Sequence, residues 1–329
     1  MNLTPQTLAR EAAATGFGVE PLEKVFRLMV LLDALNSHPF LKTRIALKGG
    51  TALNLFHFEV PRLSVDIDLN YVGPADREAM LAERPKVEQA VQAVCSREEL
   101  AIKRMPPDHA GGKWRLTYVA SKGGSGNLEL DVNFMLRTPL WSCPVSECHP
   151  VGSFRAAPVC ILDLHELAAG KAAALLARSA SRDIFDSRAL LATPGLDPAK
   201  LRLGFIVYGG INRKDWRTVS SADIKIDANE VLAELVPMLR ADLAPGRGHV
   251  AEWADHLVTE CRERLSVLLP LKEAEMEFLR RLNDNGDIAP ELLTGDAGLQ
   301  ETIRSHPGLL WKALNVRKHR GLGDGGVEA

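Results

Sequence analysis

Apolar residues follow two different periods along this chain, and the pattern changes near residue 160. Before that point, short stretches alternate apolar and polar residues as half-buried strands do, and helical patterns separate them. After it, apolar residues return every three or four positions, as on amphipathic helices. We therefore predict an α+β domain over residues 1–160, with helices at its N-terminal end, and a helical domain over residues 161–329.

The predicted elements follow directly from these periods. In the first domain the pattern predicts two helices within 1–40, a strand at 45–47, a helix at 52–58, a strand at 63–72, a polar helix at 77–96, and strands at 114–120 and 128–134. In the second domain it predicts helices at 164–178, 181–191, 228–240, 249–269, 272–283 and 300–316.

A glycine turn joins the first short strand to the helix that follows it. The turn reads Gly49-Gly50-Thr51. A turn of this kind between a strand and a helix can hold phosphate with backbone N–H groups and a hydroxyl. Alone it is a weak signal, because such a turn most often has no ligand.

Two predicted strands carry acidic residues at alternate positions. In the strand at 63–72, one face is apolar and the other is polar, with the polar positions Ser64, Asp66, Asp68 and Asn70. The strand at 128–134 repeats the pattern, and its polar face holds Glu129, Asp131 and Asn133. A single acidic pair on a strand is usually a solvated surface. If the two strands lie in one sheet, however, Asp131 joins Asp66 and Asp68 on the same face.

Three neighbouring carboxylates suit phosphoryl transfer by two-metal catalysis, in which one ion activates the attacking hydroxyl and the other holds the triphosphate and the leaving pyrophosphate. Mg²⁺ prefers oxygen ligands, and a negatively charged triphosphate cannot approach bare carboxylates. We therefore expect Asp66, Asp68 and Asp131 to hold Mg²⁺, with Mn²⁺ as an alternative, and an NTP to be the substrate.

Composition and charge limit the class of protein. With 329 residues, two domains are expected, and 46% hydrophobic and 25% charged residues are ordinary for a globular chain. We find no apolar run long enough to span a membrane, no secretory signal, and five scattered cysteines, so we expect a cytoplasmic protein. Cys143, Cys148 and His149 lie close together but lack the second ligand pair of a zinc site.

The order of these motifs resembles the AbiEii/AbiGii (MenT-like) toxin family, whose members are minimal nucleotidyltransferases of the DNA polymerase β superfamily. The matching residues are L-K-G-G-T-A-L-N-L-F, then P-R-L-S-V-D-I-D-L-N, and later L-E-L-D-V-N. A helical E-L-x-x-x-K motif matches at Glu166 to Lys171, and an R-D-x-x-D motif matches at Arg182 to Asp186.

The resemblance implies a polymerase β-like core, completed at its nucleotide cleft by the helical domain. It implies catalytic roles for Asp66, Asp68, Asp131, Lys171 and Asp186. It further implies nucleotide binding by Gly49, Gly50, Thr51, Ser64, Lys171 and Asp183, with Lys171 meeting the triphosphate. Taken without the family, Lys171 could be a lysine at the edge of an apolar stripe, and the aspartates could form ion pairs.

The resemblance also implies a toxin of a bacterial toxin–antitoxin system, with a cognate antitoxin as partner and the 3′ end of tRNA as acceptor. Two basic clusters favour RNA. The first lies around Trp216 and consists of Arg213, Lys214 and Arg217. The second lies beside Trp311 and consists of Lys312, Arg317, Lys318, His319 and Arg320. A protein or small-molecule acceptor, or a catalytically silent nucleotide-binding regulator, are the alternatives.

Overall fold

The computed structural model describes residues 3–105, 111–246 and 248–321. The described chain forms two compact units, and each is discussed by itself. The first comprises Met1–Arg137, Cys143–Leu162 and Leu232–Arg247, and the second comprises Thr138–Ser142, Asp163–Val231 and Gly248–Ala329. The boundary expected near residue 160 lies beside one of the places where the chain passes from one unit to the other.

A mixed five-stranded sheet forms the centre of the first unit, in the order β1-β2-β5-β4-β3. Only β2 and β5 are parallel; the other neighbours are antiparallel. Its strands are β1 (Ile45–Lys48), β2 (Asp66–Tyr71), β3 (Ala101–Arg104), β4 (Gly111–Val119) and β5 (Ser125–Asn133). A separate pair joins β6 (Val145–Ser146) to β7 (Val159–Cys160).

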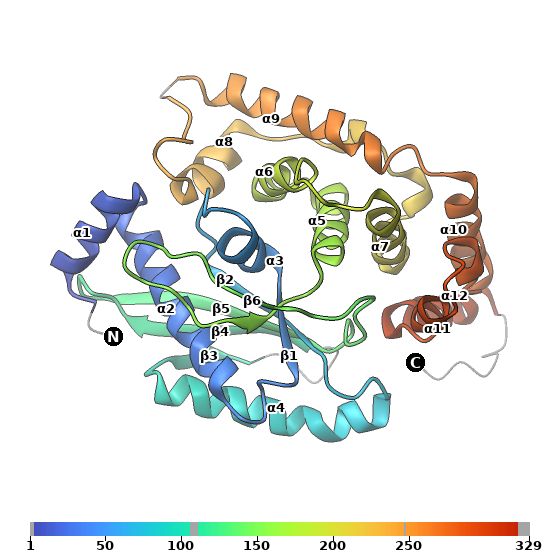
Figure 1. Cartoon of the computed structure of the whole chain (residues 1–329), viewed down its shortest axis with the longest axis horizontal. Helices are drawn as coiled ribbons and strands as arrows, with labels where there is room; N and C mark the ends of the chain where they lie inside the picture. The colour runs from blue at the N-terminus through green and yellow to red at the C-terminus, as the bar shows by residue number, and fades with distance from the viewer. Residues whose placement is uncertain (1–2, 106–110, 247, 322–329) are drawn as a thin grey trace. The chain divides into compact units, whose positions relative to one another are not determined.

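The apolar side of this sheet packs against helices α2 (Val19–Ser37) and α4 (Arg77–Arg97), while α3 (Gly49–Ala52) lies on the other side (Figure 1). Alternate side chains of the strands point to the helices, so Ile67, Leu69 and Leu130 are fully buried. Tyr71 continues this row, and its hydroxyl donates to Glu83 of α4 at 2.8 Å. The remaining helices of the unit are α1 (Pro5–Thr15), the π-helical turn η1 (Leu53–His57) and the 3₁₀ turn η5 (Val236–Met238).

Helices build the second unit, and α5, α6 and α7 form its interior. Helix α5 packs against α6 and α7, α6 packs against α9, and α12 packs against α7 and α10. Its α-helices are α5 (Leu164–Arg178), α6 (Ser181–Leu190), α7 (Pro198–Ile211), α8 (Ala228–Glu230), α9 (Val250–Arg264), α10 (Glu273–Asn285), α11 (Ala297–Arg304) and α12 (Pro307–Arg320). Its short turns are η2 (Trp216–Thr218), η3 (Ser221–Asp223), η6 (Leu265–Val267) and η7 (Pro290–Leu292), and η4 (Val231–Leu235) spans the change of unit.

Two predicted helices are wrong in extent because proline interrupts them. The expected helix at 300–316 is two helices, since Pro307 has no N–H to continue α11 and instead begins α12. The expected helix at 228–240 breaks into short turns around Pro237, and its second half returns to the first unit, where Leu63 donates to the carbonyl of Met238 at 2.8 Å.

Candidate active site

Four carboxylates occupy neighbouring positions on the polar face of the sheet. In the parallel register of β2 and β5, Asp68 lies opposite Asp131, and Asp66 lies opposite Glu129. Residues paired directly across two strands project to the same side of a sheet. Asp131 therefore lies beside Asp68, on the face that also carries Asp66.

Two lysines extend this row on both sides. Lys48 of β1 lies opposite Asp68, and Lys113 of β4 lies opposite Asp131. One transverse row of the sheet therefore reads lysine, aspartate, aspartate, lysine. The Lys113 ammonium turns to the neighbouring row and contacts Glu129, with 2.7 Å between Nζ and Oε2. Glu129 is thereby partly neutralised.

The surroundings of Asp131 disfavour its ionised form. Burial raises its pKa, and the adjacent Asp68 adds to the rise, while Lys48 and Lys113 oppose it. A bound cation would reverse this shift, because it favours the ionised carboxylate.

The donor chemistry of this face fits a hard divalent ion. Its carboxylate oxygens are the ligands that Mg²⁺ prefers. In the described part of the chain, however, no three acidic, histidine or cysteine side chains are gathered as they would be around a bound ion. The register supplies adjacent donors, and like-charge repulsion gives a physical reason for them to stay apart until a cation is present.

The Gly49-Gly50 turn packs directly against these acidic side chains. Gly49 has a φ of +73°, and a Cβ on it would lie 2.2 Å from Oδ2 of Asp68. A Cβ on Gly50 would lie 2.8 Å from the Ser64 hydroxyl and 3.0 Å from Nη2 of the buried Arg62. Only glycine allows the turn to come this close to the carboxylate and to the residues that precede it.

Thr51 and Asn70 lie on the same strand–turn assembly but are buried. Thr51 is fully buried, and its hydroxyl donates to the backbone carbonyl of Asp66 at 2.5 Å. This hydrogen bond ties the start of α3 to the first carboxylate position. Asn70 is also fully buried, and neither polar atom of its side chain has a hydrogen-bond partner in the structure as described. An unpartnered buried amide is uncommon in folded proteins, and this one lies on the strand that carries Asp66 and Asp68.

A second polar cluster joins α5 to α6 in the helical unit. The Lys171 ammonium lies 3.1 Å from Oδ1 of Asp183 and 2.9 Å from Oδ2 of Asp186. The side chains are 9%, 3% and 0% exposed, respectively. Arg178 adds a contact of 2.7 Å to Asp183, and these cations outweigh burial, so the pKa of Asp183 is lowered. The two motifs that contain these residues are therefore joined by buried ion pairs.

Glu166, which opens the E-L-x-x-x-K motif, has an internal role. It is 1% exposed, accepts a hydrogen bond from the Tyr208 hydroxyl at 2.5 Å, and accepts another from the Leu140 amide at 3.1 Å. Burial raises its pKa to about 7, although these hydrogen bonds oppose the rise. Glu166 thus fixes the segment around Leu140 to α5 and α7.

The predicted basic and aromatic surface around Trp216 is wrong. Trp216 is fully buried and packs on Phe205, with ring centroids 5.3 Å apart. Lys214 is paired with Asp223 at 2.9 Å, and Arg217 is paired with Asp215 at 2.7 Å. Of the predicted cluster, Lys214 and Arg217 are therefore neutralised locally, beside an aromatic residue that is buried.

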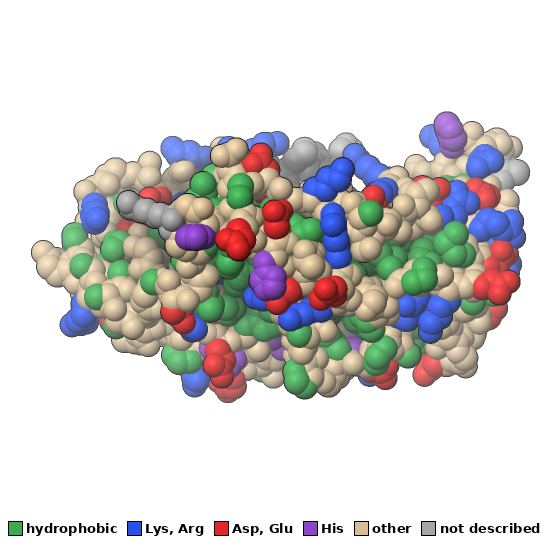
Figure 2. All heavy atoms as spheres, turned by 90° about the horizontal axis from the view of Figure 1, so that it is seen from above, with side chains coloured by type: hydrophobic (Ala, Val, Ile, Leu, Met, Phe, Trp, Pro, Cys, Tyr) green, Lys and Arg blue, Asp and Glu red, His purple; other side chains and the backbone are tan. Residues whose placement is uncertain are grey.

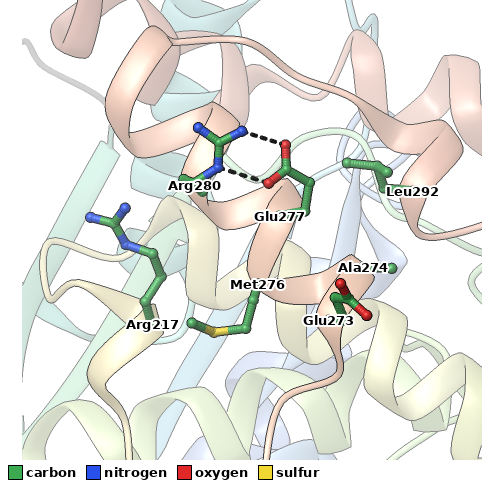
Figure 3. A pocket seen from close by; sticks show the side chains of 7 residues that line it. All are labelled: Arg217, Glu273, Ala274, Met276, Glu277, Arg280 and Leu292. Atoms are coloured by element: carbon green, nitrogen blue, oxygen red, sulfur yellow. Dashed lines mark hydrogen bonds and ion pairs between the residues drawn. The ribbon is translucent and has the colours of Figure 1, made fainter.

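A large hollow of about 760 Å³ on α10 contains none of the predicted site residues (Figure 3). Arg280 and Glu277 lie side by side on α10 and form an ion pair of 2.6 Å, while Met276 and Arg217 line the side toward η2. The ion pair between Arg280 and Glu277 thus satisfies two of the charged side chains in its lining.

Sequence reasoning missed three residues of the carboxylate face. Lys48 stands directly before the glycine turn, and that position was the available signal. Lys113 lies outside the predicted strand, which began one residue later, so nothing in the sequence aligned it with Asp131. No pattern in the sequence indicated Arg62, because its burial beside Gly50 depends on the path of the chain before β2.

Comparison with known proteins identifies the class of enzyme that this fold and site define. The fold resembles that of MenT4, a nucleotidyltransferase toxin from Mycobacterium tuberculosis H37Rv, with a TM-score of 0.58 and 16% sequence identity, over 94% of this chain and 99% of that one. The family model "Nucleotidyl transferase AbiEii toxin, Type IV TA system" matches residues 30–255. The chain belongs to the AbiEii nucleotidyltransferase toxin family and is a nucleotidyltransferase. No curated protein matches it.

The family assignment and the mixed α+β fold confirm the corresponding predictions from sequence. Among the helices of the described residues, none is long and apolar enough to cross a membrane.

Proposed function

We propose that this enzyme transfers a nucleotide from an NTP to the 3′ end of tRNA, with Asp66, Asp68 and Asp131 as its metal ligands. The observation that carries the proposal is the row of carboxylates across β2 and β5, next to the glycine turn. Membership of the toxin family favours a cognate antitoxin as the protein partner.

In this proposal the carboxylates hold Mg²⁺, or Mn²⁺ in its place, which supplies activation of the acceptor hydroxyl and charge neutralisation at the pyrophosphate. Gly49 and Gly50 offer backbone N–H groups to the phosphates, and Ser64 lies against Gly50 to support the turn. The buried contact of Thr51 with the backbone of Asp66 makes Thr51 a positioning residue for this turn.

Lys171 is proposed to offset the remaining negative charge of the triphosphate. Its support is its place in the family motif, together with its fixed position between Asp183 and Asp186. The ion pairs hold its ammonium in place without a ligand, and preorganised charge of this kind is an efficient electrostatic stabiliser. Asp186 and Asp183 are then positioning residues for Lys171.

The test is incubation with each α-labelled NTP in turn, Mg²⁺, and either total bacterial RNA or total bacterial protein. We expect one nucleotide to label an RNase-sensitive band of tRNA size, and Asp68→Asn to give no label. Label in the protein fraction would replace the RNA acceptor by a protein one. Absence of transfer to RNA, protein and a small-molecule extract would favour the silent regulator.

A further inference from the structure

A basic hollow with an exposed tryptophan lies on the helical unit, where the end of α7, α10 and α12 meet. Its volume is about 360 Å³, and its lining includes Arg213, Asn283, Trp311, Lys312 and His319. None of these residues belongs to the carboxylate face or to the Lys171 cluster. Figure 2 shows blue and purple side chains together at the right-hand end of the molecule, where α10 and α12 lie in Figure 1.

Trp311 supplies a flat apolar surface that faces solvent. Helix α12 buries Leu309 and Ala313 against its neighbours, whereas Trp311 is 39% exposed. The buried tryptophans of this chain, such as Trp114 and Trp216, are core residues. An exposed tryptophan at the rim of a hollow offers a face on which a nucleobase can stack.

Basic side chains lie around this aromatic face. Arg213 is exposed at the end of α7 and makes no ion pair within the described residues, and His319 is exposed on α12. The Lys312 ammonium donates to the carbonyl of Asn212 at 2.8 Å, and burial lowers the pKa of Lys312. Arg320 also lines the hollow, 3.4 Å from the carboxylate of Asp284. This charge complements a phosphate backbone.

Side-chain amides complete the lining. Asn283 has no hydrogen-bond partner for its side chain among residues that the structure describes, and Asn315 uses one amide hydrogen to reach the carbonyl of Trp311 at 2.8 Å. Amides carry both donors and acceptors, so they match the edge of a nucleobase. The carboxylates of an acidic peptide would use only the donors of these amides.

We propose that this hollow binds one unpaired nucleotide of an RNA strand, with its base on Trp311 and its phosphates near Arg213 and the cations of α12. The biological role of this contact rests on the proposed RNA acceptor. The hollow would then hold part of the acceptor strand independently of the reaction.

Binding of a fluorescein-labelled single-stranded RNA of about ten nucleotides, followed by anisotropy in the full chain, tests this directly. We expect Trp311→Ala to weaken binding about tenfold and Trp311→Phe, which keeps an aromatic face, less than about threefold. Arg213→Ala should lower the slope of log affinity against log salt concentration by about 0.7. Lys225→Ala, at an exposed lysine outside the hollow, is the matched control and should leave both quantities unchanged.

The outcomes separate this site from the proposed reaction. Equal affinities of Trp311→Ala and Lys225→Ala would overturn the RNA site while leaving labelling of RNA intact. Labelling of protein with unchanged RNA binding would overturn the proposed acceptor instead. Displacement of the RNA by poly-glutamate with the same dependence on Trp311 would assign the hollow to an acidic protein partner.

Discussion

The carboxylate face of the sheet and the Lys171 cluster of the helices hold similar residue types in opposite electrostatic conditions. On the sheet, Asp66, Asp68 and Asp131 lie side by side, and the nearby Lys113 is used by Glu129. In the helical unit, Lys171 is enclosed by two aspartates that pair with it directly. Adjacent like charges weaken a fold and favour a ligand, whereas a buried opposite pair stabilises its own geometry.

The difference predicts that activity and stability separate at the two places. Asp68→Asn removes a charged metal ligand, so we expect transfer to fall by about 10³-fold, as for a principal charged stabiliser. Because the change also relieves repulsion between carboxylates, the free energy of unfolding should stay the same or rise. Lys171→Ala removes the cation that two buried carboxylates share, so we expect a loss of about 3–5 kcal/mol in the free energy of unfolding. Urea unfolding and labelled-NTP transfer measure both quantities.

Two further variants sharpen this prediction. Arg178→Ala also removes a partner of Asp183, but the Arg178 side chain is 66% exposed, so it should cost less than about 1 kcal/mol. Lys171→Arg should restore part of the stability, while transfer stays reduced because the guanidinium differs in shape. If folded Lys171→Ala transfers nucleotide at the wild-type rate, Lys171 has a structural role only.

The sequence allowed the acidic strands to be predicted because alternation alone determines which side chains share a strand face. Alternation along one strand does not show which other strands pair with it. Lys48 and Lys113 join the row only because β1 and β4 lie on either side of β2 and β5. Helix α7 was missed for another reason: it is apolar on nearly all sides, so it lacks the polar face that marks an amphipathic helix.

The glycine turn offers a smaller test of the same comparison. Gly49→Ala places a Cβ 2.2 Å from Oδ2 of Asp68 in a backbone region that disfavours side chains. Gly123 has a similar positive φ, of +88°, but a Cβ there would meet nothing within 4 Å. Gly123→Ala should therefore cost only the backbone strain, about 1–2 kcal/mol.

Gly49→Ala should cost more than this control and should also slow transfer by about tenfold or more, because it displaces a carboxylate that charge stabilisation depends on. The two variants are compared by urea unfolding and by the transfer rate at saturating NTP. Equal losses of stability with unchanged transfer would show that the turn does not position Asp68.

The helical unit also contains a carboxyl group that is neutral at moderate pH, and Glu166→Gln tests it through the pH dependence of stability. Burial raises the Glu166 pKa from 4.5 to about 7. Below pH 4.5 the Glu166 carboxyl group is protonated in both the folded and the unfolded chain, so its contribution to stability is fully present. As pH rises toward 7, the unfolded chain releases the proton while the folded chain keeps it, so stability falls by about 1.4 kcal/mol per pH unit. Above pH 7 this contribution of Glu166 is lost, and the free energy of unfolding no longer depends on its ionisation.

Glutamine imitates the protonated carboxyl group, since its oxygen can accept from the Leu140 amide and its NH₂ can donate to the Tyr208 hydroxyl. Relative to the wild type, Glu166→Gln should therefore gain about 2 kcal/mol of unfolding free energy between pH 5 and pH 7. Urea unfolding at several pH values gives this difference, in which the other titrating groups cancel. Glu166→Ala, which loses both hydrogen bonds, should be less stable than Glu166→Gln throughout. Parallel curves for the wild type and Glu166→Gln would mean that the two hydrogen bonds keep Glu166 ionised in spite of its burial.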